Sequence, residues 1–125
     1  MTIKLFRVIL PVPAIEAGSR FYEQVLAIAG KRVSGGRHYF RCGETILACY
    51  SPRDDGDAWD VPPNPEHLYF AVDDLEAVFA RCLAASCKHV DSAIQVRPWG
   101  ERSFYAEDPF GNKLCFVDEK TVFTG

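Results

Sequence analysis

The chain repeats a strand-and-helix pattern after sixty positions. Residues 7–17 read RVILPVPAIEA, and residues 67–77 read HLYFAVDDLEA. The first six positions of the two copies match in polarity, and both copies then reach an apolar-Glu-Ala start typical of a helix. A strand that runs into a helix twice, in register, is typical of a duplicated unit whose copies bury each other's apolar faces. The repeat therefore predicts two equivalent modules.

Length and composition set the scale of these modules. A chain of 125 residues has the size of one ordinary domain and can fold without metal or disulfide staples. Its hydrophobic content of 48% is typical of a globular protein, and no apolar run approaches the roughly 20 residues of a membrane span. We expect a single domain over residues 1–125, with module one at about 2–51, a linker at about 52–65 and module two at about 66–119.

Charge and cysteine content indicate which partners the protein can bind and in which cellular compartment it is found. A net charge of −3 and a pI near 5.6 leave no basic face for nucleic acid. The N-terminal run MTIKLFRVILPV lacks a small-residue cleavage site and is interpreted as a first strand rather than a secretion signal. Five cysteines without a CxxC pair suit free, mostly buried thiols in a reducing compartment. We expect a cytoplasmic protein that binds neither nucleic acid nor membrane.

The local patterns of module one predict one helix and four strands. Residues 3–12 alternate in polarity as a strand does, and the prolines at its end stop it. Apolar residues at helical spacing predict a helix over Ala14–Ala29, with Gly30 as its C-cap. Turn signals at 34–36 and 43–44 divide residues 31–50 into three short strands.

Module two follows the same plan after a Pro-, Asp- and Gly-rich junction at 51–65. The patterns predict a helix over Asp73–Ser86 with Asp73 or Asp74 as N-cap, a turn at Asp108–Asn112, and strands at His67–Val72, His89–Arg97, Glu101–Glu107 and Lys113–Val117. The predicted fold is α+β, in which two βαβββ modules form a curved, cup-like, eight-stranded sheet with flanking helices.

Three runs in this order, RFYEQVL, HLYFAVDDLEA and EDPFGNKLCF, carry a family resemblance. They resemble the vicinal oxygen chelate superfamily, which includes glyoxalase I, fosfomycin-resistance enzymes, extradiol dioxygenases and bleomycin-resistance proteins. The resemblance extends from about residue 2 to about residue 118. It implies the glyoxalase/bleomycin-resistance fold, in which metal-using members place ligands from the first and last strands of each module inside the cup.

The resemblance assigns the four ligand positions to Arg7, Leu47, His67 and Cys115, and only His67 is the usual residue type. The guanidinium of Arg7 offers donors only and repels a divalent cation. Leu47 has no donor atom, whereas zinc and related ions take three or four N, O or S ligands. We therefore expect no metal and no other cofactor, and a divalent metal remains the alternative.

Two residues are candidates for catalysis. His67 is either a ligand-facing base or hydrogen-bond donor, or an imidazole satisfied by its neighbours. Cys115 is either a thiolate that a nearby positive charge activates, or a small hydrophobe on a strand face, which is the more common case.

The remaining site residues point to ligand binding. Arg7 either pairs with a carboxylate such as Glu44, Glu101 or Glu107, or anchors an acidic group of a ligand. Trp99 precedes a glycine at the lip between two strands, where similar members stack aromatic rings on a planar ligand. The predicted ligand-binding set is Arg7, His67, Tyr69, Trp99, Arg102, Tyr105 and Cys115.

Three functions follow from this set. The first is metal-independent binding or sequestration of a planar or acidic organic ligand in the cup. The alternative is a metal-dependent lyase, isomerase, thiol transferase or dioxygenase of the same superfamily. The third is a module that acts through its interface. A homodimer is expected, because relatives usually dimerise and the exposed sheet edges and residues 121–123 need cover.

Overall fold

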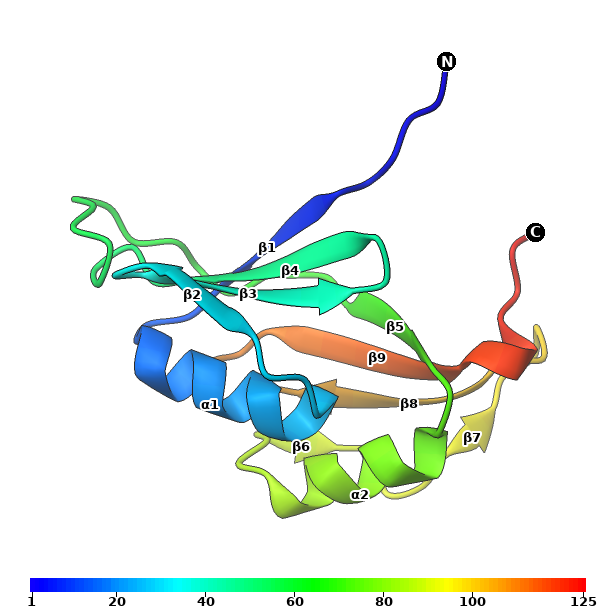
Figure 1. Cartoon of the computed structure of the whole chain (residues 1–125). Coiled ribbons are helices and arrows are strands. Elements are labelled where there is room, and N and C mark those ends of the chain that lie inside the picture. Colours follow the sequence, from blue (N-terminus) through cyan, green and yellow to red (C-terminus); the bar gives the residue numbers. More distant parts are fainter. The chain divides into compact units, whose positions relative to one another are not determined.

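The computed structural model describes all 125 residues as two compact units, Met1–Pro63 and Asn64–Gly125. Each unit carries one copy of the repeat and places one helix against one mixed sheet (Figure 1). The boundary between the units falls inside the segment predicted to join the modules. No helix in residues 1–125 has both the length and the apolar character needed to cross a membrane.

Unit 1 has the predicted βαβββ order. Its elements are β1 (Arg7–Pro11), α1 (Ile15–Leu26), β2 (Lys31–Ser34), β3 (Arg37–Cys42) and β4 (Thr45–Tyr50). The strands lie in the order β1-β4-β3-β2, with β1 parallel to β4 and the other pairs antiparallel. The two predicted turn signals therefore separate strands as expected.

One face of the unit 1 sheet packs on α1. Register aligns Leu47 of β4 with Phe40 of β3, so these two side chains share a face. The Phe40 ring contacts Tyr22 of α1, and all three residues are buried. Burial of these apolar side chains is the main driving force for docking the helix.

Helix α1 is shorter than the predicted Ala14–Ala29. It stops at Leu26 because Ala27 adopts a left-handed backbone with φ 55°. The prediction that Gly30 is the C-cap is therefore wrong. Gly30 instead lies against β3, where an added Cβ would come within 2.7 Å of the His38 ring.

The predicted linker belongs in part to unit 1. Ala14 precedes α1 and has no capping side chain, but the Ile15 amide donates to Oδ2 of Asp54 at 2.7 Å. Asp54 thus caps a helix that begins 39 residues earlier. Its neighbour Asp55 accepts from the Ser34 hydroxyl at 2.6 Å.

Gly36 lies where this loop crosses the β2–β3 turn. Its amide donates to Asp55 at 3.0 Å, and the amide of Ser51 donates to its carbonyl at 2.8 Å. A Cβ on Gly36 would lie 2.3 Å from the Ser51 carbonyl oxygen. Glycine is required here for close backbone approach.

Unit 2 repeats the order with one strand more than predicted. Its elements are β5 (Leu68–Val72), α2 (Leu75–Ala84), β6 (His89–Val90), β7 (Gln95–Val96), β8 (Arg102–Glu107), β9 (Lys113–Asp118) and the short 3₁₀ helix η1 (Glu119–Thr121). The sheet order is β5-β9-β8-β6, with β7 also paired to β8 and β5 parallel to β9.

The single strand predicted at His89–Arg97 is in fact two short strands. The Asp91 amide donates to the Tyr105 carbonyl at 3.0 Å, while the Asp91 carboxylate accepts from the Tyr105 amide at 2.9 Å. A side chain thus takes the place of a backbone partner and breaks the ladder. Nine strands in two mixed sheets replace the eight predicted, and a cup formed by both sheets stays a prediction.

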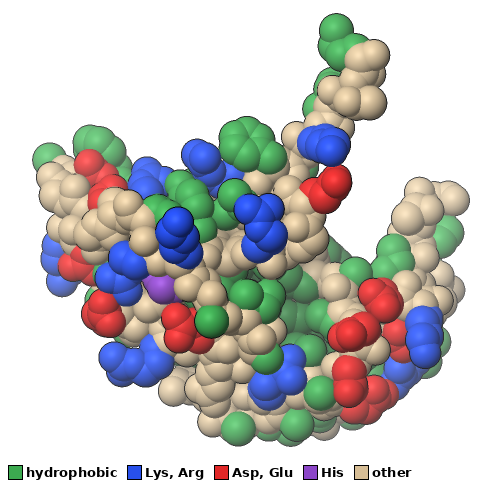
Figure 2. All heavy atoms as spheres, viewed as in Figure 1, with side chains coloured by type: hydrophobic (Ala, Val, Ile, Leu, Met, Phe, Trp, Pro, Cys, Tyr) green, Lys and Arg blue, Asp and Glu red, His purple; other side chains and the backbone are tan.

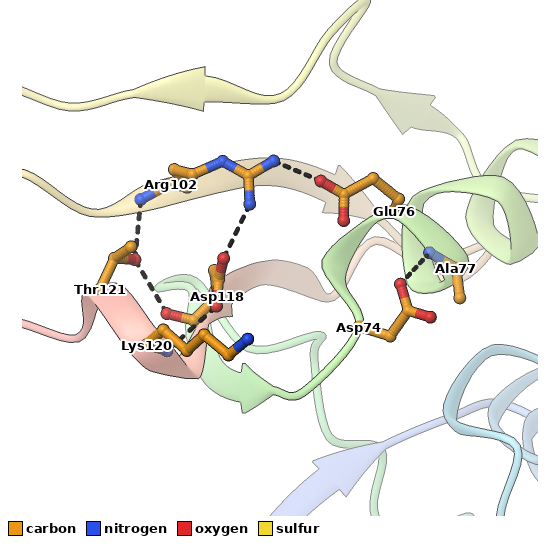
Figure 3. A network of polar contacts seen from close by, with 7 residues as sticks. All are labelled: Asp74, Glu76, Ala77, Arg102, Asp118, Lys120 and Thr121. Carbon is orange, nitrogen blue, oxygen red and sulfur yellow. Dashed lines mark hydrogen bonds and ion pairs between the residues drawn. The ribbon is translucent and has the colours of Figure 1, made fainter.

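Helix α2 covers an aromatic core. Phe79 meets Phe104 edge to face, and Phe104 stacks on Phe116. Asp74, one of the two residues predicted as the N-cap of this helix, caps it and accepts from the Ala77 amide at 3.1 Å (Figure 3).

The predicted turn at Asp108–Asn112 is confirmed. The buried Asp108 carboxylate accepts from the amides of Phe110 and Asn112, both at 2.8 Å. The Asn112 carboxamide in turn accepts from the Asn64 amide at 2.8 Å. The turn therefore fastens the first residue of unit 2 to its last hairpin.

Candidate functional site

Strand alternation divides unit 2 into a face toward α2 and a face away from it. Phe104 and Phe116 point to α2. Register aligns Tyr69, Cys115 and Tyr105 across β5, β9 and β8, so these three share the opposite face. We call this surface the tyrosine face and define it by His67, Tyr69, Arg97, Ser103, Tyr105 and Cys115.

Three rings gather on the tyrosine face. His67 lies just before β5, and its ring centroid is 4.6 Å from that of Tyr105 and 6.5 Å from that of Tyr69. The Tyr69 side chain is exposed, whereas His67 and Tyr105 are half-buried. A hydrogen bond to Tyr105, and then partial burial, raise the pKa of Tyr69. The sequence predicted all three residues, and the structure brings them together.

Arg97 also belongs to this face, although the sequence reasoning missed it. Its guanidinium carbon lies 4.7 Å from the centre of the Tyr105 ring. Nε donates to the Ser103 hydroxyl at 2.9 Å, and one terminal nitrogen is 3.5 Å from Asp91. Only 14% of the side chain is exposed. Gln95 pairs with Ser103, and a residue two positions further along shares that face, but the sequence alone does not show this register.

Cys115 lies under this polar layer with 1% of its surface exposed. Burial raises the pKa of its thiol to about 11, and the Ser103 hydrogen bond and the Arg97 charge offset this only in part. The thiol is therefore neutral at neutral pH. The structure supports the alternative in which Cys115 is a small hydrophobe on a strand.

Arg102, which we predicted as a ligand-binding residue, lies on the face of β8 opposite to that of Tyr105. One terminal nitrogen donates to Asp118 at 2.7 Å and the other to Glu76 at the start of α2 (Figure 3). These two bonds raise the pKa of the guanidinium. The Arg102 amide also donates to the Thr121 hydroxyl at 3.0 Å. Arg102 joins α2, β9 and η1, and the contacts are structural.

Trp99 stands at the tip of the β7–β8 hairpin, which turns at Gly100 with φ 94°. Trp99 has 47% of its surface exposed to solvent. Its N–H donates to Glu101 at 2.8 Å, and the same carboxylate accepts from the Phe123 amide at 2.9 Å. Trp99 is therefore bonded within its own hairpin, and Glu101 links this hairpin to the C-terminal segment.

Arg7 occupies the corresponding face of unit 1. Its guanidinium carbon lies 5.0 Å from the Phe6 ring and 5.3 Å from the Tyr39 ring. Glu44, one of its predicted partners, pairs with Lys4 at 3.5 Å instead. Aromatic rings therefore take the place of the carboxylate within unit 1.

Register corrects one assignment in unit 1. Leu47 is aligned with Val8 and Phe40 and faces α1, so it does not share a face with Arg7. The true counterpart of Cys115 is Ala48, which pairs with Tyr39 as Cys115 pairs with Tyr105. The motif match failed by one residue because the two hairpin turns differ in length.

A sequence model of the Glyoxalase/Bleomycin resistance protein/Dioxygenase superfamily matches residues 4–116. The chain belongs to this superfamily. No curated protein sequence matches the chain.

Solved structures of this superfamily share the fold. Lactoylglutathione lyase from Agrobacterium tumefaciens has 22% identity and a TM-score of 0.68, with 94% of each chain covered. A glyoxalase-related enzyme from Fulvimarina pelagi has 19% identity and a TM-score of 0.76, with 98% of this chain and 92% of that one covered. The bleomycin resistance determinant encoded on transposon Tn5 has 16% identity and a TM-score of 0.70, with 94% and 99% covered.

The superfamily includes metal enzymes, so the donor set of this member matters. His67 supplies one imidazole, and Cys115 supplies a buried thiol that burial keeps protonated. The Arg97 cation lies on the same face. Residues 1–125 contain no group of three or more His, Cys, Asp or Glu side chains arranged to hold a metal ion. On the tyrosine face, His67 and Cys115 supply two donor atoms, fewer than the three or four ligands that zinc and related ions take.

Proposed function

We propose that this superfamily member binds a small, planar, acidic organic molecule on the tyrosine face, without a metal ion, and thereby sequesters it. The observation that carries the proposal is the Arg97 guanidinium above the Tyr105 ring, beside the His67 and Tyr69 rings. A cation next to an aromatic surface is suited to a ligand that joins a flat apolar body to a negative group.

The hydrogen bonds of Arg97 leave capacity for a ligand. Its Nε has a partner of ordinary length in Ser103, at 2.9 Å. Its terminal nitrogens reach Gln95 at 3.4 Å and Asp91 at 3.5 Å, which is long for hydrogen bonds. A ligand carboxylate can form shorter, charge-assisted, bidentate bonds with these nitrogens.

The rings offer the complementary apolar surface. Tyr69 is 62% exposed, so a planar ligand can stack on it without displacing the core. Arg7 with Tyr39 repeats the cation and ring in unit 1. In this proposal Arg7 is an anchor for an acidic group on unit 1 by itself.

The test is calorimetric titration of the whole protein with 2-naphthoate and with the neutral amide of the same ring system. The carboxylate should bind, and Arg97→Gln should weaken it about 10- to 100-fold, because a charged hydrogen bond is lost. Arg53→Gln, at an exposed position in the 52–56 turn, is the matched control and should bind as the parent does. Equal affinity of parent and Arg97→Gln, or of acid and amide, would contradict the proposal.

The alternative activity is a metal-dependent lyase, isomerase, thiol transferase or dioxygenase, and His67 on the tyrosine face is the observation that favours it. Elemental analysis of untagged protein, followed by titration with Zn²⁺, Ni²⁺, Mn²⁺ and anaerobic Fe²⁺, separates the two functions. Stoichiometric binding that is lost in His67→Ala would overturn metal independence.

We further propose that the protein acts as a homodimer in a reducing cytoplasm. The exposed apolar side chains of Val122 and Phe123 in the C-terminal segment would be covered by a second copy, and five free cysteines suit that compartment. Light scattering coupled to gel filtration tests the dimer, and a monomer mass at micromolar concentration would contradict it.

A further inference from the structure

The sheet of unit 1 gathers positive charge on the face that points away from α1. Phe40 and Leu47 face α1, so the residues next to them along the strands face the other way. Tyr39 of β3 is one of these. We call this surface the cation face and define it by Tyr39 and the four basic residues around it, Arg7, Lys31, Arg37 and Arg41.

Strand register places the four cations around the Tyr39 ring. Arg37 and Arg41 lie two residues before and two residues after Tyr39 on β3, so they share its face. Lys31 of β2 is paired directly with Tyr39. From β1, the guanidinium carbon of Arg7 lies 5.3 Å from the centre of the Tyr39 ring. One aromatic ring is thus surrounded by four basic residues from three strands.

Little negative charge lies against these cations. The four strands of unit 1 contain no Asp or Glu. Arg37 pairs with Asp55 of the following loop at 3.3 Å. Arg7, Lys31 and Arg41 are exposed, and none of them has a carboxylate of residues 1–125 within ion-pair distance. Cations gathered without counter-charges repel one another, and a bound anion relieves this repulsion.

The net charge of the chain does not reveal this face. The carboxylates of unit 1 lie in α1, in the β3–β4 turn and in the loop after β4, so they offset the basic residues in number but not in place. Figure 2 shows Lys and Arg side chains among hydrophobic ones over the strands of unit 1. Phe6 and Ile9 supply exposed apolar surface there. The cation face therefore offers both charge and apolar area.

We propose that the cation face binds a small molecule that joins a planar ring to two or more negative charges, as a nucleotide with a diphosphate group does. The ring stacks on Tyr39, and the phosphate oxygens accept from the guanidinium and ammonium groups. The inference extends the role proposed for Arg7, and it does not depend on ligand binding at the tyrosine face.

The arrangement of the cations favours a small ligand over a polymer. Proteins that bind single-stranded nucleic acid offer several rings along a basic groove, whereas the four cations here surround one ring. The β1 and β2 strands lie at opposite ends of the sheet order, about 14 Å apart at about 4.8 Å between neighbouring strands. Long side chains shorten this distance, as the contact of Arg7 with Tyr39 shows.

The test is calorimetric titration of the whole protein with adenosine diphosphate, adenosine and pyrophosphate, in buffer without divalent cations. Adenosine diphosphate should bind at least about tenfold more tightly than either of the others, because it engages both the ring and the cations. Equal affinity for adenosine would overturn the role of the cations, and equal affinity for pyrophosphate would overturn the role of the ring. No binding of adenosine diphosphate at about 1 mM would overturn the whole proposal.

Variants locate the site. Arg41→Gln and Lys31→Gln each remove one exposed cation and should weaken binding of adenosine diphosphate about tenfold. Tyr39→Leu should reduce this affinity to that of pyrophosphate. Arg20→Gln is the matched control, because Arg20 is an exposed arginine of α1 on the other side of the same sheet, and it should bind as the parent does. An equal loss in Arg20→Gln would overturn the assignment to the cation face.

Two further titrations separate this site from the tyrosine face and from a polymer site. Arg41→Gln should bind 2-naphthoate with the affinity of the parent, because the proposed anchor of that ligand is Arg97. Binding of adenosine diphosphate that is weakened by Arg97→Gln and not by Arg41→Gln would overturn the proposal and leave the tyrosine face as the site. An oligothymidylate that binds more tightly than adenosine diphosphate would overturn it in favour of single-stranded nucleic acid.

Discussion

Units 1 and 2 share one strand order but begin their helices in different ways. Helix α2 is capped by Asp74, the residue that directly precedes it. Helix α1 is preceded by Ala14 and is capped by Asp54, from a loop 39 residues further along the chain. The same βαβββ topology therefore tolerates a local cap in one copy and a long-range cap in the other.

The units also differ in charge. Unit 1 has eight Lys and Arg and seven Asp and Glu residues, so its formal charge is +1. Unit 2 has six Lys and Arg and ten Asp and Glu residues, so its formal charge is −4. Figure 2 shows carboxylates gathered at the end of unit 2 where α2 begins and η1 lies. The duplicated topology depends on apolar patterning, while surface charge is free to diverge.

The largest expected effect is at Gly36, where the loop at residues 51–55 crosses the β2–β3 turn. Gly36→Ala should lower the free energy of unfolding by about 3 kcal/mol, because its Cβ would overlap the Ser51 carbonyl. Urea denaturation followed by circular dichroism measures this. Gly43→Ala is the control, because a Cβ at Gly43 would meet no atom within 4 Å and only the positive φ of the backbone is unfavourable for alanine. We expect it to lower the free energy of unfolding by about 1 kcal/mol. Equal losses would show that the crossing is not tight.

The caps should have intermediate effects. Asp54→Ala and Asp74→Ala should each cost about 1 kcal/mol of unfolding free energy, through loss of an N-cap. Ala14→Asp, added to Asp54→Ala, should recover most of the loss by giving α1 a local cap. Asp73→Ala, beside the true cap of α2, serves as control and should leave stability unchanged. No loss in Asp54→Ala would contradict the long-range cap.

The smallest effect concerns pH. Unit 1 has His38 where the register of unit 2 has Phe104, and both face a helix. Burial, and then the Arg32 charge, lower the pKa of His38, against the opposing effects of Glu23 and Glu16. The unfolded chain therefore binds the proton more readily, so stability is complete above the unfolded pKa of 6.5 and falls as pH drops below it.

Substituting the unit 2 residue tests this difference. In His38→Phe the free energy of unfolding should change less between pH 7 and pH 5 than in the parent protein. Denaturation curves at both pH values and constant salt measure the change. If the free energy of unfolding of His38→Phe depends on pH as that of the parent does, groups other than His38 cause this dependence.

The sequence predicted what local patterns determine. The repeat, the turn signals and the Asp108–Asn112 motif each depend on residues close in the chain, and the elements they predict are found. The predicted C-cap at Gly30 failed because Ala27 ends the helix first, and the strand at 89–97 failed because the Asp91 carboxylate pairs with Tyr105. These outcomes depend on tertiary contacts.

The candidate site divides in the same way. His67 and Cys115 were predicted from the ligand positions of the family, and Tyr69 and Tyr105 as aromatic residues that line the cup; the structure places all four on one face of the sheet. The sequence left the direction of the Arg102 side chain open, and alternation along β8 turns it toward Glu76. Arg97 was missed because its position depends on the register of a two-residue strand.

The hydroxyl contact between Tyr69 and Tyr105 gives the molecule an optical reporter of its own. Ionised tyrosine absorbs at longer wavelength than the neutral phenol, and the contact sets the alkaline range in which Tyr69 changes form. A ligand that lies across both rings would alter this contact and shift the absorbance titration. Ligand binding to the tyrosine face can then be followed by the absorbance of ionised tyrosine in unlabelled protein, provided that the ligand does not absorb at the same wavelengths.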